Sequence, residues 1–119
     1  MSTKFSMQRD INGYNGFGVL PTTDIQAAYL TASAAQSITV PDNYPVWIAI
    51  FSYSPGSSIW VSFDGDDAVL PGASFASSNS CLNPSARTVK AGSTISLITS
   101  DTFEPGVSIE FQIVPPYQN

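Results

Sequence analysis

Apolar and polar residues alternate in short runs along most of this chain, and this pattern predicts β-strands. Residues 107–113 are the clearest case, because Val, Ile, Phe and Ile alternate there with Ser, Glu and Gln. A strand of this kind has one buried face and one solvated face. Clusters of Gly, Pro, Asp and Ser separate further short apolar runs, so about seven or eight strands are expected at a spacing of roughly 8–12 residues.

The segment covering residues 24–41 leaves two interpretations open. Asp24, followed by Ile-Gln-Ala-Ala, could cap and open a helix, because Asp is a good N-cap residue and Ala is a good helix former. Residues 29–31 and 36–41, separated by Ala-Ser-Ala-Ala, instead favour a strand, a turn and a second strand. We prefer the strands, which makes the chain entirely β.

The longest apolar stretch predicts a β-hairpin with arms at residues 46–53 and 58–63. Its turn is Ser-Pro-Gly-Ser, in which Pro fixes φ and Gly accepts positive φ. If Tyr53 pairs with Ser58, one face is aliphatic and can only be core. That face carries Ile48, Ile50, Ile59, Val61 and Phe63. The other face is aromatic, and we expect another subunit or a chain arm to cover it; it carries Trp47, Phe51, Tyr53 and Trp60.

These strands predict a single-domain antiparallel β-sandwich over residues 23–119, either jelly-roll-like or immunoglobulin-like. Residues 1–22 are expected to form an extended N-terminal arm, because a segment rich in Gly and Asn resists regular structure. Tyr14 and Phe17 are candidates for docking this arm on a neighbour. A frayed terminus explains the same composition equally well.

Charge is scarce and mostly negative in this chain. Charged residues make up 11% of it, against roughly a quarter in ordinary domains. A net charge of −5 with only four basic residues disfavours binding to nucleic acid or to an anionic membrane. A surface poor in charge is typical of proteins that pack against copies of themselves, so a homo-oligomer is expected. The first ten residues contain no apolar stretch, so we expect no signal peptide and synthesis in the cytoplasm.

The residues available for chemistry are few. The chain has no histidine and a single cysteine, Cys81. This composition excludes His-dependent nucleophilic catalysis, ordinary zinc sites and an intramolecular disulfide. Asp64, Asp66 and Asp67 could hold Ca²⁺, but their spacing differs from that of an EF-hand and a solvated turn is favoured. We therefore expect no enzyme activity, no cofactor and no metal.

Arg87 and the aromatic face each have two interpretations. Arg87 is a candidate for an ion pair with a neighbouring subunit, because Arg is favoured at interfaces, or for a local pair with Asp101 or Glu110. The aromatic face could stack on a sugar, although a subunit interface or simple core is favoured.

Three segments occur in a suggestive order. They are residues 37–41 (Ser-Ile-Thr-Val-Pro), residues 50–61 around the Ser-Pro-Gly-Ser turn, and residues 82–87 (Leu-Asn-Pro-Ser-Ala-Arg), followed by Val89, Ala-Gly at 91–92 and Ile-Thr at 98–99. In this order they resemble small virion structural proteins of tailed bacteriophages, over about residues 25–112.

The resemblance implies a place on the virion, and head decoration or cement is the expected role. The partners would be the major capsid protein and further copies of the chain, with a trimer favoured. The alternative is a carbohydrate- or receptor-binding module of a tail fibre or spike. A bacterial adhesin is disfavoured by the lack of a signal peptide.

Overall fold

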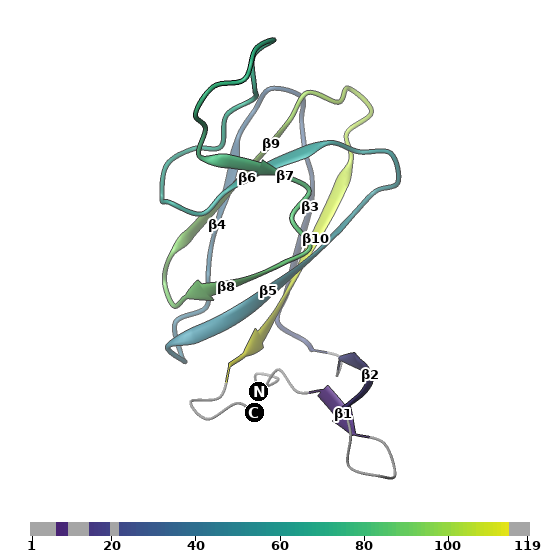
Figure 1. Cartoon of the computed structure of the whole chain (residues 1–119), viewed down its shortest axis with the longest axis vertical. Coiled ribbons are helices and arrows are strands. Elements are labelled where there is room, and N and C mark those ends of the chain that lie inside the picture. The colour runs from purple at the N-terminus through teal and green to yellow at the C-terminus, as the bar shows by residue number, and fades with distance from the viewer. Residues whose placement is uncertain (1–6, 10–14, 20–21, 115–119) are drawn as a thin grey trace.

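The chain folds into a sandwich of two four-stranded β-sheets (Figure 1). The computed structural model describes residues 7–9, 15–19 and 22–114, with side chains from residue 22 onward. The strands of the sandwich are β3 (Ile25–Tyr29), β4 (Gln36–Thr39), β5 (Val46–Tyr53), β6 (Ile59–Ser62), β7 (Ser80–Leu82), β8 (Ala86–Lys90), β9 (Thr94–Thr99) and β10 (Gly106–Ile113).

Two further strands lie within the predicted N-terminal arm. They are β1 (Met7–Arg9) and β2 (Asn15–Val19), which pair with each other in antiparallel fashion. Tyr14 lies outside the described residues, and of Phe17 only the backbone is described. The arm-docking prediction for these two residues therefore stays a prediction.

The order of the strands defines the topology as a jelly roll. The sheets run β3-β10-β5-β8 and β4-β9-β6-β7, with antiparallel neighbours throughout. The pairings β3–β10, β4–β9, β5–β8 and β6–β7 are those of one long hairpin closed by the β6–β7 loop. Winding that hairpin brings β10 beside β5 and β9 beside β6, which gives a double-sheet jelly roll. Successive strands from β3 to β6 alternate between the sheets, so the immunoglobulin-like alternative is excluded.

The predicted hairpin over residues 46–63 is wrong, although both of its strands exist. β5 belongs to the first sheet and β6 to the second, so residues 54–57 form an arch between the sheets. The Ser57 N–H donates to the Ser54 carbonyl at 3.2 Å, and Gly56 takes a φ of 76° in this turn. Because β5 and β6 lie in different sheets, Tyr53 and Ser58 are not cross-strand partners. The face of β5 that was predicted from this pairing to be core is therefore not determined by it.

The core takes the aromatic residues of β5 in place of its isoleucines. Trp47 and Phe51 point inward, whereas Ile48 and Ile50 lie on the outer face of the sheet and are half-buried. The indole N–H of Trp47 donates to the Tyr44 carbonyl at 3.1 Å. A buried Trp usually has such a partner, and this bond offsets the cost of removing the indole N–H of Trp47 from water.

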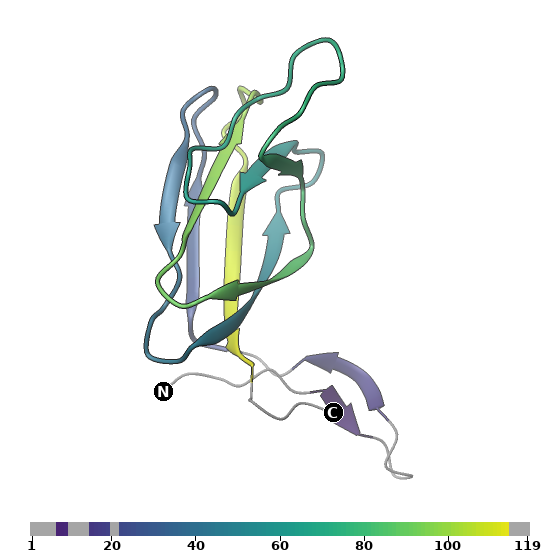
Figure 2. The same cartoon turned by 60° about the vertical axis from the view of Figure 1, so that its left-hand side comes forward.

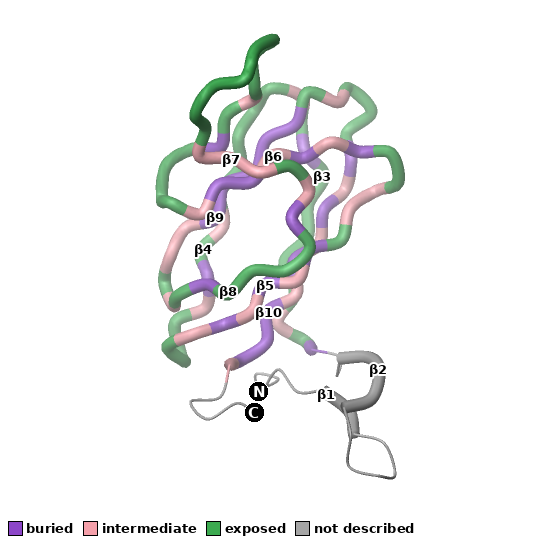
Figure 3. The backbone as a smooth tube through the Cα atoms, in the orientation of Figure 1, coloured by how far each residue is buried: buried purple, intermediate pink, exposed green. Residues whose placement is uncertain are grey.

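Both sheets contribute to a continuous core between them (Figure 3). In the register of β10 and β5, Phe111 lies opposite Ala49 and Ile113 lies opposite Trp47. The alternation predicted for residues 107–113 is confirmed, with the apolar side chains buried. The remaining core residues include both predicted positions of β6 and are Leu30, Val40, Phe51, Ile59, Val61, Val89, Ile95, Leu97, Val107 and Ile109.

The preference for two strands over a helix in residues 24–41 is confirmed, and β4 falls where the second strand was predicted. The first strand, β3, covers Ile25–Tyr29 and not the predicted residues 29–31. β7 was not predicted, because its Ser-Cys-Leu sequence shows no alternation and lies in a polar stretch. Across the described part of the chain, no helix is long and apolar enough to cross a membrane.

Residues 63–79, which connect β6 to β7, fold back over the outer face of the second sheet. The Ser96 Oγ accepts a hydrogen bond from the Ala68 N–H at 2.9 Å, and the Ser62 Oγ donates to the Asp66 carbonyl at 2.7 Å. These bonds explain how two serines on an outer sheet face are buried. Figure 1 shows the tip of this loop at the top of the molecule, coloured teal to green.

Candidate functional site

The four aromatic residues predicted to share an exposed face do not share one. Trp47 is 0% exposed and Phe51 is 7% exposed, so neither offers a surface to a partner. Tyr53 and Trp60 are half-buried and belong to different sheets. The prediction of a single aromatic interface is therefore wrong, because the core of one chain already covers half of it.

Tyr53 anchors β5 to the segment that leads into β8. Its hydroxyl donates to the Pro84 carbonyl at 2.5 Å, and its ring stacks on Phe51 with a centroid distance of 6.1 Å and an interplanar angle of 9°. Burial raises the pKa of Tyr53 above its ordinary value, Cys81 raises it further, and Arg87 opposes both effects. Tyr53 therefore has a structural role within one chain.

Arg87 is exposed on β8. Its Nη1 donates to the Ala86 carbonyl at 2.8 Å. Within residues 22–114 it forms neither of the predicted local ion pairs, and Asp101 instead accepts the Ser58 N–H at 2.7 Å. An ion pair between Arg87 and another subunit stays a prediction.

A pocket of about 490 Å³ lies between Trp60 and the 63–79 loop. Trp60 lines it from β6, and the loop supplies Val69, Leu70 and Phe75 together with several serine hydroxyls. Phe75 is among the exposed large apolar residues of the molecule. An aromatic ring beside hydroxyl groups is a combination that suits a compact ligand with both apolar and polar faces.

The outward side of β3, β10 and β5 carries little charge and is exposed along β3. We define the outer face as nine outward residues of β3, β10 and β5: Ile25, Ala27, Tyr29, Gly106, Ser108, Glu110, Ile48, Ile50 and Ser52. The buried Gln112 and the terminal Val46 also lie on this side of the sheet and are left out of the set. Glu110 lies between Ile25 and Ile50 in the strand register and is the only charged residue of this set. Ile25 is 47% exposed and Tyr29 is 76% exposed. Solvated sheet faces are normally polar, so these apolar residues make the outer face a candidate contact surface.

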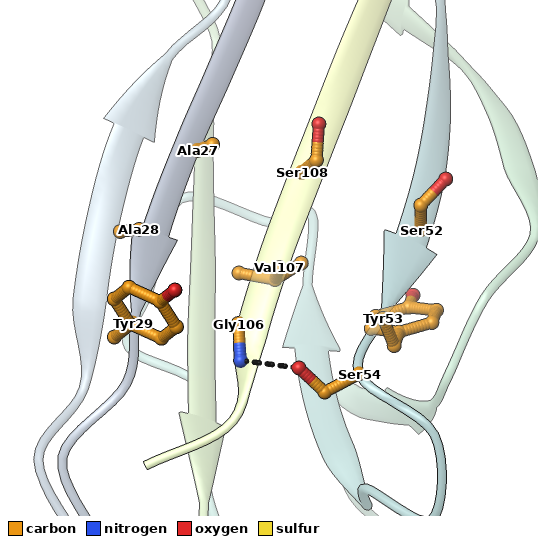
Figure 4. Close-up of a pocket in the computed structure, with 9 residues that line it drawn as sticks. All are labelled: Ala27, Ala28, Tyr29, Ser52, Tyr53, Ser54, Gly106, Val107 and Ser108. Atoms are coloured by element: carbon orange, nitrogen blue, oxygen red, sulfur yellow. Dashed lines mark hydrogen bonds between the residues drawn. The ribbon is translucent and has the colours of Figure 1, made fainter.

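A groove of about 490 Å³ lies at the end of the first sheet where β10 begins (Figure 4). Tyr29 from β3 and Tyr53 from β5 line it on either side of β10, with Gly106 between them. Tyr29 belongs to the outward side of the sheet, whereas Tyr53 lies opposite Val107 on the inward side. A Cβ added at Gly106 would lie 3.3 Å from the Tyr29 ring, so the glycine leaves room for that ring beside β10. The Gly106 N–H donates to the Ser54 Oγ at 2.8 Å and ties β10 to β5 at this end.

The aspartate segment forms a turn, as favoured from the sequence. Asp64 Oδ1 accepts hydrogen bonds from the Asp66 N–H at 3.1 Å and from the Asn79 Nδ2 at 3.2 Å, and Gly65 takes a φ of 92°. In the part of the chain that the structure describes, no group of three or more His, Cys, Asp or Glu residues is arranged to hold a metal.

No family model, curated protein or solved structure matches the chain. The strand order therefore identifies the structural class of the protein, a small eight-stranded jelly-roll domain, and does not identify its function. Folds of this kind serve unrelated functions, so the exposed surfaces must carry the functional argument.

Proposed function

We propose that this protein is a structural component of the virion of a tailed bacteriophage, and that it decorates the head by binding the major capsid protein. The resemblance of residues 25–112 to small virion proteins of such phages supports the proposal. The jelly-roll topology is compatible with it, since this architecture is common among capsid proteins.

The observation that carries the proposal is the outer face of the first sheet. It lies on the antiparallel sheet formed by β3, β10 and β5, presents Ile25 and Ile50 on either side of Glu110, and carries the exposed Tyr29 farther along β3. Depletion of charge and enrichment of aromatic and aliphatic side chains distinguish the centre of protein interfaces from other surface. A face of this form suits docking on the broad surface of an assembled shell.

A protein that binds a capsid shell through this face would stabilise the assembled shell thermodynamically. If it binds the assembled lattice and has no affinity for the separate subunits, each bound copy stabilises the lattice by mass action. A contact of about 800 Å² per partner is usual for such a specific interface. No catalytic group is needed for this role.

The test is shell binding by an outer-face variant. Ile50→Arg places a charge at the centre of the outer face, and we expect it to abolish co-sedimentation with purified phage heads while the domain stays folded. Ser100→Arg, at an exposed position in the turn between β9 and β10, is the matched control and should bind as the unmodified protein does. Equal binding by both variants contradicts the proposal, as does cryo-electron microscopy of virions that places a few copies at the tail tip.

A homo-oligomer remains part of this proposal. The trimer favoured from the sequence rested on burying the aromatic face, and Trp47 and Phe51 are already buried within one chain. Nothing in the described structure supports a threefold arrangement over another, so the symmetry has to be argued from a different surface.

A second candidate function is carbohydrate or receptor binding, and the Trp60 pocket favours it. The half-buried indole beside Ser hydroxyls offers a stacking surface and hydrogen-bonding groups. A glycan array with the purified protein tests it. Binding that is lost in Trp60→Ala and kept in Phe103→Ala, a substitution of another exposed aromatic, would support this function; an array without binding rejects it.

A further inference from the structure

The edge strand β3 is fully exposed and lacks the usual protection of an edge. All five of its residues, from Ile25 to Tyr29, are exposed. The strand contains neither proline nor a charged residue, and residues 25–41 as a whole carry no charged side chain. Proteins normally protect exposed edges with charge, proline or bulges, because unpaired backbone groups invite another strand.

The opposite side of the sandwich has the protection that β3 lacks. The edge strand there in the first sheet is β8, which carries Arg87 and Lys90. In the second sheet the corresponding edge strand, β7, is three residues long. The β7–β8 side of the domain is therefore protected against pairing with another strand, whereas the β3 side is not.

The register shows which backbone groups of β3 are free. The Phe111 N–H donates to the Asp24 carbonyl at 2.8 Å, and the Leu30 N–H donates to the Pro105 carbonyl at 2.9 Å. In an antiparallel strand every second residue directs both backbone groups to the same side, so the even-numbered residues between these two face β10. Ile25, Ala27 and Tyr29 therefore direct their N–H and C=O groups away from β10, and of these groups the Tyr29 carbonyl already accepts a hydrogen bond from the Gln36 Nε2 at 3.3 Å.

An extended strand can pair with the whole row, and β3 itself is a suitable one. We propose that a second copy of this chain pairs with β3 in antiparallel fashion, about a two-fold axis at Ala27. This register places Ala27 opposite Ala27 of the other copy and Ile25 opposite Tyr29. It is the register that uses all three outward residues, and it forms one continuous eight-stranded sheet with about six interchain hydrogen bonds. Two of these bonds use the second lone pair of the Tyr29 carbonyl, because Gln36 Nε2 already donates to that oxygen.

The side chains fit the same register. An aliphatic β-branched residue opposite an aromatic one is a favourable cross-strand pair, and the symmetry provides this Ile25–Tyr29 pair twice. The small Ala27 at the axis avoids a collision of the strand with its own copy. No like charges meet, because the strand is uncharged.

The second sheet adds to the contact. β4 is the edge of that sheet on the same side of the sandwich, as Figure 2 shows for the two blue strands. Gln36 Nε2 donates to the Tyr29 carbonyl at 3.3 Å, and Gln26 Nε2 donates to the Thr39 carbonyl at 3.5 Å, which links the two edges. A two-fold axis normal to the sheets brings β4 of both copies together as well, so the interface extends beyond a single strand pair.

Charge substitution at the symmetry axis tests the inference. In Ala27→Lys and in Ala27→Glu, like charges face each other across the axis, and each variant alone should sediment as a monomer where the unmodified protein is a dimer. An equimolar mixture of the two variants places Lys opposite Glu and should restore the dimer. Thr88→Lys, an exposed position on β8, is the control and should remain dimeric.

A second variant tests the register independently. Ile25→Glu alone should dissociate the dimer, and Ile25→Glu combined with Tyr29→Lys in one chain should restore it, since each Glu then faces a Lys. Thermal unfolding of every variant establishes that the domain is folded.

Three results overturn the inference: an unmodified protein that is monomeric well above micromolar concentration, an oligomer that Ala27→Lys leaves intact, or a Lys and Glu mixture that stays monomeric. All measurements use purified protein without phage heads. A dimer that fails to bind heads would therefore reject the proposed decoration role and leave this inference standing.

Discussion

Asn83 and Ile59 are joined by two reciprocal hydrogen bonds across the end of β6. The Asn83 N–H donates to the Ile59 carbonyl, and the Asn83 Oδ1 accepts the Ile59 N–H, both at 2.8 Å. The Asn83 Nδ2 also donates to the Ser57 carbonyl at 3.0 Å, and the backbone at Asn83 has a φ of 44°. One side chain thus completes the hydrogen bonding of β6 at the place where the chain leaves the second sheet for the first.

Replacing Asn83, which is half-buried in the connection between β7 and β8, should destabilise the domain strongly. Asn83→Ala removes two side-chain hydrogen bonds. It also places Ala, whose side chain cannot form such bonds, in the left-handed region, so we expect the free energy of unfolding to fall by about 2–4 kcal/mol. Urea unfolding measures it. Asn83→Gly relieves the backbone strain and should recover about 1 kcal/mol of that loss; identical values for the two variants would contradict this account.

Trp47→Ala should unfold or nearly unfold the domain, because it empties the centre of the core. Substitutions of buried Trp by Ala cost about 3–5 kcal/mol, a large share of the roughly 5–15 kcal/mol that stabilise a domain. Urea unfolding followed by the fluorescence of Trp60 measures the change. Trp60→Ala, at the half-buried aromatic of the other sheet, should cost less; the reverse order would contradict the placement of the two indoles.

Tyr53 makes stability depend on alkaline pH. Its folded-state pKa is raised by burial, so above about pH 10 the unfolded chain loses the phenol proton while the folded chain keeps it. The contribution of Tyr53 is therefore fully present below about pH 10 and decreases as the pH rises further. Tyr53→Phe should flatten this alkaline decline, measured by urea unfolding across that range, and should cost about 1 kcal/mol at neutral pH through loss of the bond to Pro84. Tyr44→Phe is the control and should keep the full decline.

Ser96→Ala should loosen the 63–79 loop more than it weakens the sandwich. The Ala68 N–H loses its acceptor, which costs about 1 kcal/mol, and the loop is freed from the second sheet near the Trp60 pocket. Limited proteolysis within residues 69–78 should become faster, with a small change in the urea midpoint. Ser108→Ala, on the outer face, is the control; unchanged cleavage in Ser96→Ala would show that this bond does not retain the loop.

Much of the strand content could be predicted from the sequence, and the pairing could not. Residues 107–113 alternate cleanly, so one face was determined without knowledge of the neighbours. β5 is apolar on both faces from Val46 to Phe51, so its orientation depends on which strand lies beside it. The Pro-Gly turn after β5 suits a hairpin and an arch between sheets equally. The predicted hairpin, which pairs β5 with the next strand in the sequence, was wrong.

The candidate site was harder to find for a related reason. Ile25, Glu110 and Ile50 form one row of the outer face, yet they come from distant parts of the chain and meet through strand order alone. The sequence does contain one signal of the open edge, the uncharged stretch from residue 25 to residue 41. Its meaning depends on β3 and β4 being edge strands, which the strand order of each sheet determines.

The long-hairpin pairing also determines when the chain can fold during synthesis. Among the strands that the structure describes, β3 pairs with β10 alone, and Ala28 lies opposite Val107 in that pair. A ribosome releases β3 long before β10 exists, so neither sheet can close until nearly the whole chain has emerged. Until then the uncharged stretch of residues 25–41 remains unpaired, and such a segment is prone to aggregate because non-local pairing is slow. Chaperone supply during translation should therefore limit the yield of this protein more than the stability of its finished fold does.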